Sequence, residues 1–193
     1  MSEFRVVFIC TGNIFRSAIA EAVFRAATEG LPVEVSSAGT LDLGGASAHT
    51  EAIQLAPRFG IDLSAHRSRC LTGVDLGEAD LVVGFERAHV AAAVVESGAD
   101  RARTFTLPEL TGLLDTVPPT EGEPVEAARA AVERASAQRV ESWSLPEIAD
   151  PLGGSSAVFT ESATLVAELT ARLADQLFPQ ASAVAGREVP RSA

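Results

Sequence analysis

The sequence contains no tyrosine, one tryptophan and two cysteines, Cys10 and Cys70, among its 193 residues. With so few cysteines, and no Cys/His spacing typical of structural zinc, the sequence excludes a disulfide scaffold and a zinc module. Positive charge is also scarce, because 15 Lys and Arg stand against 26 Asp and Glu, for a formal net charge of −11. Nucleic acids and anionic membranes attract clustered cations, so we expect neither as a partner.

Long hydrophobic runs are missing too. No apolar stretch approaches the roughly 20 residues that cross a bilayer, and the apolar-rich run near the N-terminus, Phe4–Ile9, is too short for a secretory signal. We therefore expect a cytoplasmic protein with reduced thiols and, by default, a monomer. The hydrophobic content of 47% is ordinary for a globular chain of one domain.

Short apolar runs alternate with segments of helical periodicity. Strands are expected over Phe4–Ile9, Val33–Ser37, Ala79–Phe85 and Arg103–Leu107. Helices are expected over Ser17–Thr28, His49–Phe59, Arg87–Val95, Val125–Ser142 and Ser156–Leu177, with a further short helix starting at Pro108. This alternation predicts an α/β fold, a small doubly wound domain with a four-stranded parallel sheet flanked by helices. We expect residues 1–178 to form this single domain and 179–193 to be a disordered tail.

The loop after the first strand is the expected ligand site, because open parallel sheets bind ligands beyond the carboxyl ends of their strands. There the chain reads Cys10–Ser17, CTGNIFRS, and continues directly into a helix. Gly12 permits a tight turn, and the amides of such a loop can converge on an anion together with the N-terminus of the helix. We expect the phosphate-binding loop to comprise Thr11, Gly12, Asn13, Ile14, Phe15 and Ser17.

Cys10 and Arg16 carry the predicted chemistry of this loop. A cysteine at the end of a buried strand is usually an inert small hydrophobe, but here the helix N-terminus and Arg16 favour its thiolate form. Arg16 can hold two phosphate oxygens at once, and Ser17 can donate a hydrogen bond to the sulfur. The pattern predicts hydrolysis of phosphate monoesters through a phosphocysteine at Cys10. No metal or other cofactor is expected, because Arg16 and the amides supply positive charge.

Several segments resemble the low-molecular-weight protein tyrosine phosphatase family, in particular its bacterial members. They are VVFICTGNIFRSAIAEAVF, VSSAGT, GIDLSAHRSR, ADLVVGFERAHV and the dipeptide Asp150-Pro151. The resemblance implies the same four-stranded fold, with residues 111–144 as a helical insertion. It also implies a phosphotyrosine protein or a small phosphate ester as substrate.

The resemblance assigns a role to individual residues. Cys10 would be the nucleophile, Arg16 the transition-state clamp, and Asp150 the general acid that later activates water. Asn13 would hold the turn of the loop within a polar network formed with Ser17, Ser37 and His66.

The chain departs from this family in the walls that normally flank a phenyl ring. Leu152, Gly153 and Gly154 follow Asp150-Pro151 where aromatic residues are common, and the loop Thr40–Ala48 lacks an aromatic residue. We expect Phe15 to contribute an apolar wall instead. Phosphatase chemistry is thus better supported than any particular substrate.

Three alternatives stay open from the sequence. An arsenate reductase could use the same scaffold, although Cys70 is the only other thiol and the Asp150-Pro151 pair favours a phosphatase. A phosphate-binding regulatory protein without turnover would keep the loop but leave phosphopeptides intact. A flavodoxin-like FMN binder shares the fold class, but its phosphate loop would not require Cys10 and Arg16.

Overall fold

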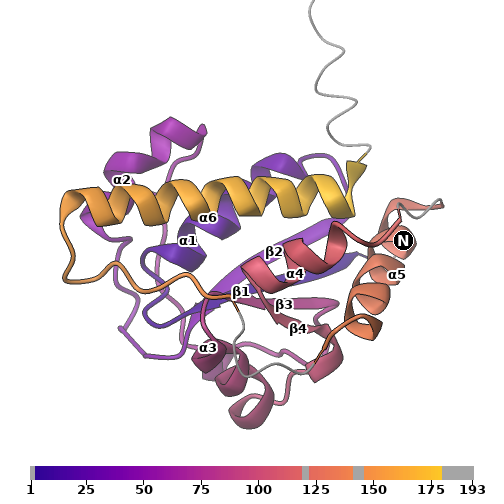
Figure 1. Cartoon of the computed structure of the whole chain (residues 1–193). Coiled ribbons are helices and arrows are strands. Elements are labelled where there is room, and N and C mark those ends of the chain that lie inside the picture. The colour runs from indigo at the N-terminus through magenta and orange to yellow at the C-terminus, as the bar shows by residue number, and fades with distance from the viewer. Residues whose placement is uncertain (1–2, 119–121, 141–145, 180–193) are drawn as a thin grey trace, which may run out of the picture.

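The sheet is the centre of the molecule. The computed structural model describes residues 3–118, 122–140 and 146–179 (Figure 1). Its strands are β1 (Phe4–Cys10), β2 (Val33–Gly39), β3 (Leu81–Gly84) and β4 (Thr104–Thr106). They form one parallel sheet in the order β2-β1-β3-β4, which confirms the predicted fold. Of the expected tail 179–193, all but Pro179 lies outside the described residues.

The helices follow the predicted alternation with shifted ends. They are α1 (Arg16–Ala27), α2 (Thr50–Leu55), α3 (Arg87–Ala91), α4 (Leu107–Leu114), α5 (Pro124–Ala137) and α6 (Ser156–Leu177). Short 3₁₀ turns cover Ala56–Phe59, Leu71–Gly73 and Arg101–Arg103, and a π-helical turn covers Ala92–Glu96. Helix α6 has the predicted bounds, whereas α5 ends at Ala137, and the last residues of its predicted range, 141–142, lie outside the described residues.

Both faces of the sheet are covered, as the apolar run of β1 predicts. Phe4, Val6 and Phe8 point into the larger core, to which α1, α4, α5 and α6 contribute, and Figure 1 shows α6 lying along α1 and α4 on this side. The alternate residues Val7 and Ile9 point into a smaller core on the opposite face. No helix in the described ranges is long and apolar enough to cross a membrane.

The predicted insertion 111–144 is tied to the sheet by Arg139, just beyond α5. Its guanidinium lies 3.9 Å from the ring centroid of Phe105 in β4, and its Nε donates to a carboxylate oxygen of Glu109 at 2.9 Å. This buried ion pair fixes the end of α5 against β4 and α4, so the described part of the insertion packs as an integral element of the domain.

The carboxyl edge of the sheet is crossed by the segment Pro146–Asp150. The Ile148 amide donates to the carbonyl of Phe85, just after β3, at 2.8 Å. The Thr106 hydroxyl, at the end of β4, donates to the carbonyl of Pro146 at 3.0 Å. These two bonds hold the Asp150 region over the end of β1, where the Cys10 loop begins.

Candidate active site

The loop after β1 has one residue in an unusual backbone conformation and passes close to the backbone of β2. Asn13 has a φ of 53° and is the one non-glycine residue with positive φ in the described part of the chain; asparagine tolerates this conformation better than most residues. Gly39 of β2 lies against the loop, and a Cβ at this position would be 2.8 Å from the Thr11 carbonyl oxygen. The loop can therefore curl beside β2 only while residue 39 is glycine.

The loop carbonyls point outward, which turns its amides inward. Carbonyl oxygens of the loop accept backbone hydrogen bonds from the chain after β2: Cys10 from Thr40 at 3.0 Å, Thr11 from Leu41 at 2.8 Å and Ile14 from His49 at 2.8 Å. Because a peptide unit is planar and trans, the amide next to each of these carbonyls points the opposite way. No described side chain caps the N-terminus of α1, so its first amides also stay available for an anion.

Cys10 lies at the base of this cradle. Its Sγ accepts a hydrogen bond from the Asn13 amide at 3.2 Å and lies 3.0 Å from the Ser17 Oγ. The Ser17 Oγ in turn accepts from the Asn13 side-chain amide at 2.9 Å. With one lone pair of Ser17 occupied in this way, its proton is free to be donated to a Cys10 thiolate.

The Asn13 side chain connects the loop to the surrounding structure. Its Nδ2 also donates to the Ser37 Oγ at 2.7 Å, and its Oδ1 accepts from the Arg69 amide at 2.8 Å. The backbone carbonyl oxygen of Asn13 lies 2.7 Å from the His66 Nε2. The structure therefore brings together the predicted network residues Ser17, Ser37 and His66 around Asn13. Beyond them, the Ser37 hydroxyl donates to the buried carboxylate of Glu21 in α1, a residue that the sequence analysis missed.

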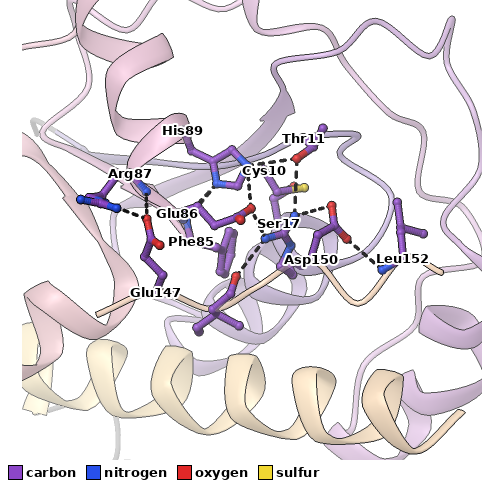
Figure 2. A network of polar contacts seen from close by, with 12 residues as sticks. Cys10, Thr11, Ser17, Phe85, Glu86, Arg87, His89, Glu147, Asp150 and Leu152 are labelled. Atoms are coloured by element: carbon purple, nitrogen blue, oxygen red, sulfur yellow. Dashed lines mark hydrogen bonds and ion pairs between the residues drawn. The ribbon is translucent and has the colours of Figure 1, made fainter. Parts of the chain in front are cut away.

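Arg16 is 1% exposed, although it carries a full positive charge. Its Nη1 lies 2.6 Å from a carboxylate oxygen of Glu86, and its Nη2 lies 2.6 Å from one of Asp150. Nη1 also donates to the carbonyl of Ile148 at 2.9 Å. Two carboxylates thus hold the predicted clamp, and their residues, Glu86 and Asp150, are labelled in Figure 2.

Asp150 thus meets the Cys10 loop through Arg16. One of its carboxylate oxygens accepts from the Leu152 amide at 3.1 Å, which closes a small turn at the predicted Asp150-Pro151 dipeptide, while the other pairs with Arg16. Glu147, on the same segment, accepts from the Arg87 amide at 2.7 Å. The carboxylate of Asp150 is 30% exposed, so it lies between the buried clamp and solvent.

The prediction that Phe15 forms an apolar wall of the site is wrong. Its side chain is 2% exposed and lies with its ring centroid 5.2 Å from that of Phe159 in α6. It therefore packs into the core and does not form a wall at the mouth of the site. In a curled loop, neighbouring side chains point in different directions, and Ile14, next to the buried Phe15, is half-buried.

Glu86 and His89 also belong to the site, although they were not among the residues predicted from the sequence. Their position in the chain could have indicated them. Both follow β3, at the same carboxyl edge as Cys10, and the edge rule that singled out the first loop applies equally to this one. His89 is 2% exposed, and its Nε2 lies 3.2 Å from the Thr11 Oγ1. Burial, together with the nearby positive charge of Arg16, lowers the pKa of His89 to about 4, although Glu86 and Asp150 act in the opposite direction.

Known proteins resemble this chain in sequence and in fold. Residues 5–142 match the family profile described as low molecular weight phosphotyrosine protein phosphatase. A probable low molecular weight protein-tyrosine-phosphatase of Ralstonia solanacearum is 41% identical over 78 residues, which cover 40% of this chain and 52% of the relative. The chain thus spans about half the length of the first curated relatives that it matches.

Other similarities extend over almost the whole chain. A protein-arginine-phosphatase of Bacillus subtilis is 30% identical over 175 residues, which cover 89% of this chain and 95% of the relative. The crystal structure of a low molecular weight protein tyrosine phosphatase from T. tengcongensis superposes with a TM-score of 0.65 at 29% identity, covering 89% of this chain and 97% of that one. From the profile match and the shared fold, the chain belongs to the low molecular weight phosphotyrosine protein phosphatase family.

Proposed function

We propose that this protein hydrolyses phosphate monoesters through a phosphocysteine at Cys10. The observation that carries the proposal is one loop that holds both the Cys10 sulfur, bonded to the Asn13 amide at 3.2 Å, and the Thr11 hydroxyl, which the buried guanidinium of Arg16 reaches at 3.5 Å. A phosphate dianion entering the cradle would take the place of Asp150 on Arg16. Its phosphorus would then lie directly above the sulfur, ready for in-line attack.

The two half-reactions use the same residues. The Cys10 thiolate attacks phosphorus and the P–O bond to the leaving group breaks, while Asp150 donates a proton to the departing oxygen. Asp150 then takes a proton from a water molecule, which attacks phosphorus and breaks the P–S bond, releasing inorganic phosphate. Ser17 donates a hydrogen bond to the sulfur as it leaves as a thiolate, and Arg16 with the amides stabilises the equatorial oxygens throughout.

Binding of a phosphate dianion would give Asp150 the proton that it later donates. The carboxylate of Asp150 pairs with Arg16 at 2.6 Å. A phosphate dianion on Arg16 both removes this partner and places negative charge beside the carboxylate. The two anions can then approach only with a proton between them, so substrate binding itself prepares Asp150 to act as the acid.

Protein phosphotyrosine is the substrate that we favour. A phenolate, with a pKa near 10, leaves poorly without a proton donor, and Asp150 is positioned to supply one. The exposed hydrophobic side chains Leu41 and Leu152, 54% and 46% exposed, belong to segments bonded to the loop and to Asp150. They offer aliphatic contacts for a phenyl ring in place of the aromatic walls that the chain lacks.

Phosphoarginine is a second candidate, because the similarity to a protein named an arginine phosphatase covers 89% of the chain. The same nucleophile and clamp could act on a P–N bond. The arsenate reductase is less favoured, because Cys70 is the only other cysteine and accepts a hydrogen bond from Thr72 at 3.2 Å. We place the activity in the cytoplasm, where Cys10 would stay reduced, and propose that the protein acts as a monomer without a cofactor.

The deciding experiment supplies matched phosphotyrosine and phosphoarginine peptides and quenches the reaction with an alkaline denaturant for mass spectrometry, because the P–N bond of phosphoarginine hydrolyses in acid. We expect release of phosphate from the phosphotyrosine peptide and transient phosphate on the peptide that contains Cys10, and none on the one that contains Cys70. Faster turnover of phosphoarginine would establish the second candidate. Bound but intact peptides would indicate a silent binding protein, and arsenate turnover coupled to thiol consumption would indicate a reductase.

The Asp150→Asn variant should separate acid catalysis from phosphate binding. We expect kcat for a phosphotyrosine peptide to fall by about 10²-fold or more, because asparagine cannot protonate the leaving oxygen. For 2,4-dinitrophenyl phosphate, whose leaving group needs no proton, the first step should be much less affected. Asp115→Asn is the matched control, because Asp115 also pairs with an arginine, Arg172, but on the surface. Equal losses in kcat/KM, which reports only the first step, on both substrates would contradict the role of Asp150 as the acid.

A further inference from the structure

His89 is a buried titratable side chain that the mechanism above does not use. It lies behind the Cys10 loop, on α3, with its imidazole between the backbone after β3 and the side chain of Thr11 (Figure 2). The Nε2 is 3.2 Å from the Thr11 Oγ1 and 3.6 Å from a carboxylate oxygen of Glu86. It thus approaches both a member of the phosphate loop and an anchor of Arg16.

The surroundings of His89 determine its tautomer. Its Nδ1 accepts hydrogen bonds from two backbone amides, that of Phe85 at 3.3 Å and that of Glu86 at 3.1 Å. Two N–H groups can point at Nδ1 only if it carries a lone pair, so the ring proton is on Nε2. The low pKa of His89, about 4 because of burial and Arg16, keeps the ring neutral near pH 7. The Nε2–H is therefore a permanent donor aimed at Thr11.

This donor constrains the Thr11 hydroxyl. The Oγ1 accepts from His89 Nε2 and, at the longer distance of 3.5 Å, from the Arg16 Nη2. A hydroxyl has two lone pairs and one proton, so an oxygen that accepts twice must donate its own proton in the remaining direction. Thr11 follows Cys10 directly, and Arg16 Nη2 is the atom that a phosphate would take over from Asp150. A phosphate oxygen bound to Nη2 would therefore lie close to the Thr11 hydroxyl, which is 3.5 Å from that nitrogen.

We propose that His89 is a positioning residue, which turns the Thr11 hydroxyl into an obligatory hydrogen-bond donor to the transferring phosphoryl group. The proposal rests on the proposed phosphatase function and adds one donor to it, without changing any bond that forms or breaks. A fixed donor costs no reorganisation when charge develops on the phosphoryl oxygens, so its effect should appear in kcat more than in KM.

A competing explanation is that His89 only caps helix α3. Its contact with the Glu86 amide, together with the contact of the Glu86 side chain with the His89 backbone, forms a capping box. Capping accounts for Nδ1 but leaves the Nε2 contact with Thr11 unexplained. Gly84 adds a second sign of a shaped site, because a Cβ there would lie 2.8 Å from the Cβ of His89.

Two amide side chains distinguish these roles, because each reproduces one of the two ring nitrogens. In His89→Asn, the short side chain can place an acceptor where Nδ1 lies, which preserves the cap but removes the donor to Thr11. In His89→Gln, the longer side chain can place an amide N–H where Nε2 lies. We expect His89→Asn to lower kcat roughly 10-fold with little change in KM, and His89→Gln to retain most of the activity. The opposite order, with His89→Gln the more damaged and less stable variant, would overturn the proposal.

A double-mutant cycle with Thr11→Val tests whether His89 acts through Thr11. Valine has nearly the shape of threonine without the hydroxyl, so we expect Thr11→Val to lower kcat by a similar factor. His89→Asn added to it should then cause little further loss. Losses that multiply would show that His89 acts independently of Thr11, and the proposal would be wrong.

An NMR measurement that does not depend on turnover keeps the two proposals separable. The ¹⁵N chemical shifts of the His89 ring should show a proton on Nε2 and a lone pair on Nδ1. Addition of inorganic phosphate should shift the His89 Nε2 and Thr11 signals in the wild type, but not shift the His89 ring in Thr11→Val. If the wild type turns over no phosphate ester yet shows these shifts, the phosphatase proposal fails while the placement of Thr11 by His89 stands. A proton on Nδ1, or no response to bound phosphate, would reject the role of His89.

Discussion

Cys10→Ser should lose at least about 10⁴-fold in kcat while keeping the fold and the ability to bind phosphate. The substitution exchanges one atom at a side chain that is 3% exposed, and an oxygen can still accept from the Asn13 amide and meet Ser17. A serine hydroxyl, however, stays protonated at neutral pH and is a weak nucleophile without an adjacent base. No described residue is placed to remove its proton, since the groups around it are donors.

The measurement is steady-state hydrolysis of p-nitrophenyl phosphate beside calorimetric binding of inorganic phosphate. Cys70→Ser is the matched control, because it removes the other thiol, which lies outside the Cys10 loop, and we expect it to turn over like the wild type. If Cys10→Ser instead retained turnover within tenfold of the wild type, phosphate transfer through the Cys10 sulfur would be refuted.

Arg16→Lys should lower kcat by about 10³-fold and weaken phosphate binding, although the positive charge is conserved. The planar guanidinium meets Glu86 and Asp150 at 2.6 Å and the Ile148 carbonyl at 2.9 Å, and a single ammonium cannot span these positions. Oxygens left without a donor in this buried place should also reduce the free energy of unfolding, by about 1–3 kcal/mol.

Both quantities are needed for Arg16→Lys: kcat from steady-state kinetics and the unfolding free energy from denaturant titration. Arg172→Lys is a suitable control, because Arg172 pairs with Asp115 on the surface, where exposed ion pairs contribute little. We expect it to change neither quantity measurably. An active Arg16→Lys variant would show that a point charge suffices and that the fork geometry of Arg16 has no role in the transition state.

The order of elements and the first loop could be predicted because their signals are local. The nearly continuous apolar character of β1, interrupted only by Arg5, indicates a strand covered on both faces, and the glycine and asparagine that follow indicate a turn. The contacts of Asn13 with Ser17, Ser37 and His66 were expected only from the family resemblance. The structure supplies a physical reason for the glycine in the VSSAGT segment, since a Cβ at position 39 would lie only 2.8 Å from the Thr11 carbonyl oxygen.

The missed residues depend on contacts between distant parts of the chain. Glu86 and His89 look like ordinary polar residues at the start of a helix. The placement of β3 beside β1 is what brings them to Arg16 and Thr11. Glu21 looks like a solvated helix position, but the packing of α1 on β2 buries it against Ser37. The prediction for Phe15 was wrong for the same reason, because the ring on which it packs, Phe159, belongs to the distant helix α6.

Helix ends were predicted less well than helix positions. The predicted helix Arg87–Val95 divides into α3 and a π-helical turn, Ala92–Glu96, before Gly98 adopts a φ of 72°. The predicted helix His49–Phe59 likewise divides into α2 and a 3₁₀ turn that contains Pro57. In both places the periodicity of apolar residues continues through the change, so the pattern alone cannot detect it.

The distance along the chain between Cys10 and Asp150 has a consequence for biosynthesis. A ribosome makes the sulfur, the loop and α1 early, but the segment that carries Ile148 and Asp150, and α6 that covers α1, are among the last described parts to emerge. Until then Arg16 lacks two of its partners, and Phe15 lacks the ring on which it packs. A nascent chain would therefore contain the nucleophile Cys10 before the acid Asp150. Late in synthesis, Asp150 and the helix that completes the core around Phe15 would be added together.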